Sequence, residues 1–123
     1  MFLHGLESDV DAHGIPVGRK ARFLKERFDA RLVALDTSAA QAAARRAVEA
    51  TGSWTYPFEG YEDAFRVPLA RARAALSPET RVVVGSSFGG AVLLRLLHEA
   101  PVYRGAAVFL AGAGPKLTPY RAL

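Results

Sequence analysis

Ser87 is the residue whose type and surroundings best fit covalent chemistry. It lies in the run Gly85-Ser86-Ser87-Phe88-Gly89, which has the form G-x-S-x-G. Between a strand and a helix, this pattern gives a tight, strained turn that lifts the serine hydroxyl out of the sheet, and small neighbours leave room for it. The Phe88 amide and the dipole of the following helix would then stabilise an oxyanion. We therefore expect Ser87 to attack an ester or a similar acyl carbon.

The sequence on either side of Ser87 predicts the strand and the helix that such a turn requires. The β-branched run Val82-Val83-Val84 indicates a strand over 81–84 that is covered on both faces. Residues 88–99 are apolar almost all round, which predicts a deeply buried helix that ends before Pro101.

The rest of the chain predicts an alternation of strands and helices. Ala21, Leu24 and Phe28 share one face of a helix, and Ser38 and Gln41 have the spacing of a capping box. Pro68 lies early in a third predicted helix, which it must either kink or begin. The expected strands are 2–4, 31–35, 81–84 and 106–110, and the expected helices are 19–28, 38–50, 65–76 and 88–99. The fold class is therefore α/β: a single domain over 1–123 with a mostly parallel open sheet of about four strands and helices on both faces. Ligands of such sheets bind beyond the carboxyl ends of the strands.

Several motifs are similar to those of a known family. They are Phe-Leu-His-Gly-Leu-Glu-Ser at 2–8, Lys-Ala at 20–21, Leu-Val-Ala-Leu-Asp at 32–36 and Gly-Ser-Ser-Phe-Gly-Gly at 85–90. Over most of its length the chain resembles small esterases of the α/β-hydrolase fold, and it would form the N-terminal part of that fold. The resemblance implies that the first and third strands are neighbours, so that Gly5 meets Ser87. It also implies an oxyanion hole formed by the amides of Leu6 and Phe88. The residues expected to shape the site are His4, Gly5, Gly85 and Gly89.

A base for Ser87 is harder to find in the sequence. In the family the acid and the histidine follow the nucleophile, but here only His98 and Glu99 follow it. A helix from Ser87 would place His98 about 16 Å away, so we expect His98 to be a surface residue.

Three explanations for the missing base stay open. The chain is truncated before the acid and the histidine, or His13 serves as the base, oriented by Asp9, Asp11 or Asp36, or the domain is an inactive scaffold or binding module. Truncation would leave the fourth strand as an apolar edge and predicts self-association.

Composition narrows the possible partners. The net charge is +4, but the basic residues are scattered over helix faces, which argues against nucleic acid. There is no cysteine, so we expect a cytoplasmic protein, and no apolar run reaches about 18 residues, so we expect no membrane span. The sequence implies no metal and no cofactor. The partner that the serine motif implies is a small ester-like molecule. The glycine-rich run 111–116 does not fit nucleotide-binding spacing. Trp54, Tyr56 and Phe58 would either pin their loop to the core or line an acyl pocket.

Overall fold

The computed structural model describes residues 1–6, 9–52, 60, 62–99 and 103–110. The elements in chain order are β1 (Phe2–Leu3), α1 (Arg19–Phe28), β2 (Leu32–Val33), α2 (Ser38–Thr51), the short 3-10 helix η1 (Asp63–Phe65), α3 (Arg66–Ala75), β3 (Val82–Ser86), α4 (Phe88–Glu99) and β4 (Ala106–Leu110). The aromatic residues expected near a pocket, Trp54, Tyr56 and Phe58, and the glycine-rich run 111–116 lie outside the described residues.

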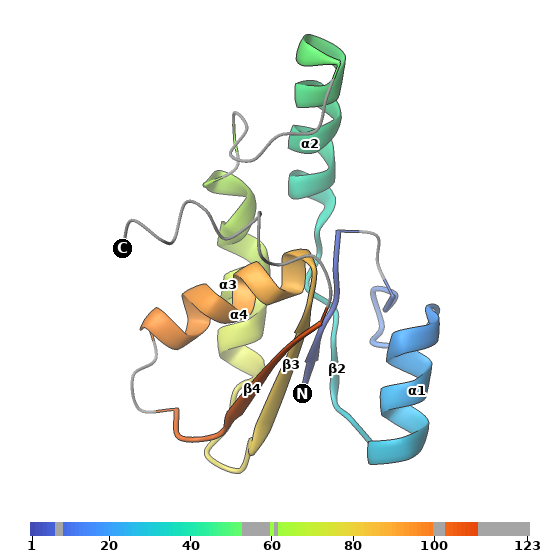
Figure 1. The fold of residues 1–123 in the computed structure, drawn as a ribbon, viewed down its shortest axis with the longest axis vertical. Helices are drawn as coiled ribbons and strands as arrows, with labels where there is room; N and C mark the ends of the chain where they lie inside the picture. Colours follow the sequence, from blue (N-terminus) through green and yellow to red (C-terminus); the bar gives the residue numbers. More distant parts are fainter. Residues whose placement is uncertain (7–8, 53–59, 61, 100–102, 111–123) are drawn as a thin grey trace.

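The four strands form one parallel sheet in the order β2-β1-β3-β4, which confirms the predicted α/β class (Figure 1). Phe2 pairs with Leu32 of β2 on one side and with Val84 of β3 on the other. The chain thus runs from β1 outward to β2 and then crosses back to β3. This change of direction creates a topological switch point between β1 and β3, where open α/β sheets bind ligands.

Alternate residues of the strands point into two separate cores. Leu3, Val33 and Val83 face α3 and α4, in the larger core. Phe2 packs with Ala21 of α1 on the opposite face. Figure 1 shows α1 on one side of the sheet and α3 and α4 on the other, whereas α2 extends beyond the carboxyl ends of the strands. The predicted placement of helices on both faces is therefore confirmed.

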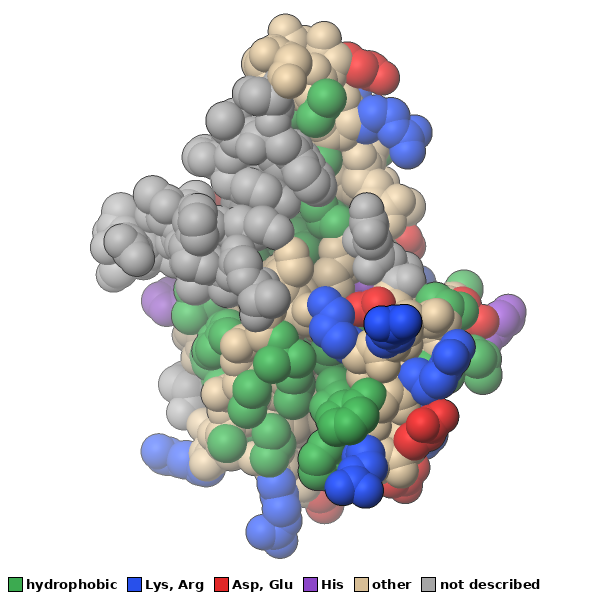
Figure 2. Space-filling view, turned by 45° about the vertical axis from the view of Figure 1, so that its right-hand side comes forward, with side chains coloured by type: hydrophobic (Ala, Val, Ile, Leu, Met, Phe, Trp, Pro, Cys, Tyr) green, Lys and Arg blue, Asp and Glu red, His purple; other side chains and the backbone are tan. Residues whose placement is uncertain are grey.

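The α1 face of the sheet is only partly covered. The strand register places Val82 and Val108 on the same face as Phe2, yet Val82 is 42% exposed and Val108 is 40% exposed. The prediction that the valine run is covered on both faces is wrong at Val82, because among the described residues α1 packs mainly over β1 and β2. Phe28 of α1, expected on the buried face, is exposed and instead contacts Phe23 edge to face. Figure 2, with the α1 side turned toward the viewer, shows apolar side chains gathered on this surface.

Two local predictions have different outcomes. Pro68 lies in the first turn of α3, where a proline does not interrupt the helical hydrogen bonds. The capping box is wrong: the N-cap of α2 is Thr37 rather than Ser38, and the Thr37 side chain makes no capping hydrogen bond. The side-chain Nε2 of Gln41 instead donates to the carbonyl oxygen of Leu6 and to the Thr37 hydroxyl. A tertiary contact with the loop after β1 has therefore replaced the local cap.

Candidate active site

Ser87 occupies the turn between the last residue of β3 and the first residue of α4. Its φ is 53°, a left-handed conformation that is uncommon for a residue with a side chain. Hydrogen bonds fix this turn on both sides. The Ser87 amide donates to the carbonyl oxygen of Leu110 on β4 at 3.1 Å, and the Ser87 carbonyl accepts from the amide of Gly90 at 2.9 Å. The strained serine turn predicted from the glycine spacing is thus present.

Glycines allow the start of α4 to lie directly against the ends of β1 and β3. A Cβ atom on Gly85 would lie 2.7 Å from the carbonyl oxygen of Gly89. A Cβ atom on Gly89 would lie 2.5 Å from the carbonyl oxygen of His4 and closer still to that of Leu3. Real Cβ atoms do not approach backbone atoms so closely. Any side chain at either glycine would therefore push α4 away from the switch point.

The loop after β1 meets the serine turn. A Cβ atom on Gly5 would be 3.4 Å from the Ser87 Cβ and 4.0 Å from its Oγ. The next residue, Leu6, is buried, and its carbonyl oxygen accepts a hydrogen bond of 2.9 Å from the Thr37 hydroxyl as well as the one from Gln41. The structure therefore brings Gly5 and Ser87 together, as the resemblance implies, and α2 anchors the loop.

His4 is a buried link between this loop and β2. Its Nε2 accepts a hydrogen bond of 3.0 Å from the Leu35 amide, so Nδ1 carries the proton and donates to the Gly5 carbonyl oxygen at 2.7 Å. Burial lowers the pKa of His4, although the Gly5 bond and the charge of Asp9 act in the opposite direction. Both ring nitrogens are engaged, so this neutral histidine orients the loop and is not placed to take a proton from Ser87.

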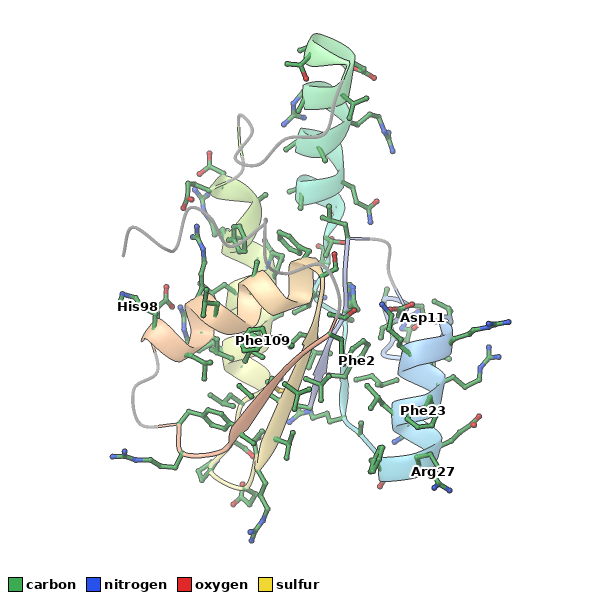
Figure 3. All side chains as sticks on the ribbon, viewed as in Figure 1. Phe2, Asp11, Phe23, Arg27, His98 and Phe109 are labelled. Atoms are coloured by element: carbon green, nitrogen blue, oxygen red, sulfur yellow. The ribbon has the colours of Figure 1, made fainter. Side chains whose placement is uncertain are left out.

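The other histidines do not complete a triad in the structure. His98 lies in the last turn of α4, far along the helix from the serine turn (Figure 3). Its neighbour Glu99 forms an ion pair with Arg73 of α3. His13 lies on the exposed loop before α1, where its backbone amide donates to the Asp11 carboxylate.

Asp36 follows β2 at the same edge of the sheet and is engaged locally. Its φ is 56°, and its carboxylate accepts a 2.6 Å hydrogen bond from the Ser38 hydroxyl. Hydrogen bonds from the Ser38 hydroxyl and amide, together with the charge of Arg71, lower the pKa of Asp36. This carboxylate is held toward α2 and α3 rather than toward a histidine.

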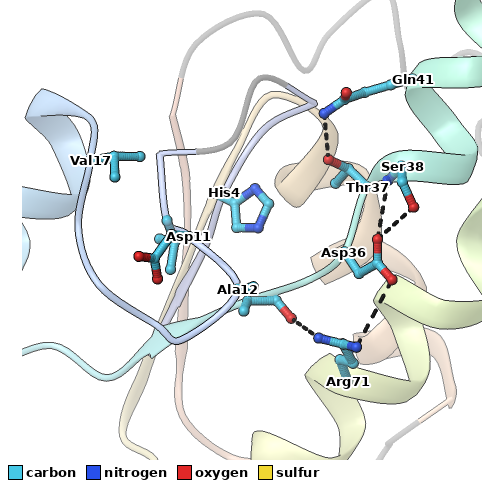
Figure 4. A pocket seen from close by; sticks show the side chains of 11 residues that line it. His4, Asp11, Ala12, Val17, Asp36, Thr37, Ser38, Gln41 and Arg71 are labelled. Atoms are coloured by element: carbon cyan, nitrogen blue, oxygen red, sulfur yellow. Dashed lines mark hydrogen bonds and ion pairs between the residues drawn. The ribbon is translucent and has the colours of Figure 1, made fainter.

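A cavity of about 550 Å³ lies beside the loop after β1, at the carboxyl ends of β1 and β2 (Figure 4). Its walls include His4, Asp36 and Arg71, but Ser87 is not among its lining residues. Residues from the loop before α1, Val10 and Asp11 among them, form the opposite wall. The His4-Gly5 segment thus separates this cavity from the serine turn.

Two contacts that hold the site were not among the sequence predictions, although Lys20 belongs to one of the motifs that carry the resemblance. The ammonium of Lys20, on α1, donates to the Ser86 hydroxyl at 2.8 Å, and Thr37 bonds to Leu6. Within the described residues, no group of three or more His, Cys, Asp or Glu side chains could hold a metal ion. No helix in that part of the chain is long and apolar enough to cross a membrane.

Comparisons with family models, with curated proteins and with solved structures found no match to this chain. We therefore infer a function from the motifs and the geometry described above.

Proposed function

We propose that the protein is a serine hydrolase of the α/β-hydrolase kind that acts on a small ester-like molecule through Ser87. The observation that carries the proposal is the left-handed conformation of Ser87, φ 53°, between a strand and a helix at the switch point of a parallel sheet. Such strain persists only when the surrounding structure imposes it, and it concentrates at functional sites. It costs roughly 1–3 kcal/mol, which a structural turn could avoid by using glycine.

In the proposed reaction the Ser87 Oγ bonds to the acyl carbon, and the carbonyl oxygen of the ester becomes an oxyanion. The N–H of Phe88, as the first residue of α4, has no acceptor within its own helix and suits this oxyanion. The N–H of Leu6 would be the second donor, since a Cβ atom on the neighbouring Gly5 would lie against the Ser87 side chain. Collapse of the oxyanion breaks the bond to the alcohol, which leaves with the proton that the Ser87 hydroxyl lost on attack. Water then adds its hydroxyl to the acyl carbon, which releases the acid, and returns a proton to the Ser87 Oγ.

A second candidate is a hydrolase-like scaffold that binds a partner without turnover. The observation that favours it is the engagement of both His4 ring nitrogens, with His98 at the far end of α4. Such a scaffold would have the serine turn and the loop after β1 but no base to accept the Ser87 proton. We also infer a cytoplasmic location from the absence of cysteine.

A fluorophosphonate probe separates the two candidates, because it forms a covalent adduct with an activated serine. We expect the folded protein to be labelled faster than the same chain unfolded in urea, and Ser87→Ala to abolish that excess. Ser38→Ala, at an exposed serine of α2, is the matched control and should leave labelling unchanged. Equal labelling of folded and unfolded chains would reject the hydrolase and favour the binding scaffold.

A further inference from the structure

Lys20 contacts the residue that precedes the proposed nucleophile. Its Nζ lies 2.8 Å from the Ser86 Oγ, although the two residues are 66 positions apart in sequence. Ser86 is the last residue of β3 and is fully buried. A hydrogen bond with one charged partner is stronger than one between neutral groups. Lys20 thus joins the first turn of α1 to the strand end from which the serine turn begins.

The position of Lys20 is unfavourable for its own helix. A positive charge near a helix N-terminus opposes the helix dipole. Two groups offset this effect: the Ser86 hydroxyl, and the Asp9 carboxylate 4.0 Å from the ammonium. Asp9 is itself held by the loop, because its carbonyl oxygen accepts hydrogen bonds from the amides of Val17 and Gly18. The ammonium is therefore held from the loop side and from the sheet side.

We propose that Lys20 is a positioning residue, which fixes Ser86 and thereby holds Ser87 in the left-handed conformation needed for attack. This inference rests on the proposed function. Backbone contacts also hold the turn: the Ser87 amide binds Leu110, the Ser87 carbonyl binds Gly90, and β3 stays paired with β4 up to Ser86. Lys20 acts through a side chain on the preceding residue. A direct Ser86–Lys20 catalytic pair does not fit, since a substrate could not reach a serine without exposed surface.

The test compares Lys20→Met with Lys25→Met. Both changes remove one positive charge from α1, but Lys25 pairs with exposed Asp29 and is not bonded to the sheet. We expect Lys20→Met to slow fluorophosphonate labelling of Ser87 about tenfold, and Lys25→Met to leave it unchanged. Ser86→Ala should slow labelling similarly, and the double variant Lys20→Met/Ser86→Ala should be no slower than either single variant. Additive losses would overturn the inference.

Amide resonances give a readout that does not depend on reactivity. In Lys20→Met the chemical shifts of the Ser87 and Phe88 backbone amides should differ from those of the wild-type protein. In Lys25→Met the same two chemical shifts should equal the wild-type values. Unchanged resonances in Lys20→Met would overturn the positioning role even if labelling slowed. If instead the resonances shift but the wild-type protein is not labelled at all, the hydrolase proposal fails while the contact that positions Ser87 stands.

Discussion

Replacing Ser87 by glycine and by alanine measures the strain in its turn. Both variants lose the hydroxyl, but only alanine keeps a Cβ atom in the left-handed conformation at φ 53°. That conformation costs a residue with a Cβ atom roughly 1–2 kcal/mol. At an unstrained position, glycine is instead less stable than alanine by roughly 0.5–1 kcal/mol because it loses more backbone entropy on folding. The two effects oppose each other, so we expect the glycine variant to be between about 0 and 1.5 kcal/mol more stable than the alanine variant.

Ser38 supplies the matched pair of variants. It is the exposed first residue of α2, and its alanine and glycine variants lose the same hydroxyl contact with Asp36. Urea unfolding of all four variants gives two glycine-minus-alanine differences. We expect the difference at Ser87 to be more favourable to glycine than that at Ser38 by about 1–2 kcal/mol, which is the strain itself. Equal differences at the two positions would refute a strained turn at Ser87.

Three further predictions concern the surroundings of Ser87. Gly89→Ala should lower the free energy of unfolding by at least about 3 kcal/mol or prevent folding, because its Cβ would meet backbone atoms of β1. Gly52→Ala, whose Cβ would enter open space, should lower it by only about 1–2 kcal/mol, as measured by urea unfolding. Similar losses in the two variants would contradict this packing. The Cβ of Gly5→Ala would make only ordinary contacts, so we expect the free energy of unfolding to change by less than about 0.5 kcal/mol. Labelling of Ser87 should nevertheless slow severalfold. Unaltered labelling would argue against a site at this loop. Burial lowers the pKa of His4, so its contribution to stability is complete above the unfolded pKa of about 6.5 and is lost as the pH falls through the folded value. The stability advantage of wild type over His4→Gln should therefore shrink on acidification from pH 7 to 5, and a constant advantage would contradict the burial.

The sequence predicted the serine turn well because the turn depends on local residues. A β-branched run, a glycine-flanked serine and a buried helix follow one another directly, so each restricts the conformation of the next. The pairing of β1 with β3, by contrast, was expected only through the resemblance. No local pattern specifies which strands are neighbours in a parallel sheet.

Three features that the sequence did not predict depend on tertiary packing. The bond from Lys20 to Ser86 depends on how α1 packs against the sheet, and the contact of Gln41 with Leu6 replaced a local cap that had the expected spacing. The exposure of Val82 likewise depends on how far α1 covers the sheet, and a run of valines carries no information about that. In each case the outcome depends on residues that lie far away in sequence.

The most direct test of the central claim is to locate the fluorophosphonate adduct by peptide mass mapping. Ser86 and Ser87 are adjacent, so fragment ions must place the adduct on one of them. The proposed site predicts an adduct on Ser87 in the folded protein and none on buried Ser86. An adduct on any other residue, or none at Ser87 after prolonged exposure of the folded protein, would contradict the assignment of Ser87 as the nucleophile.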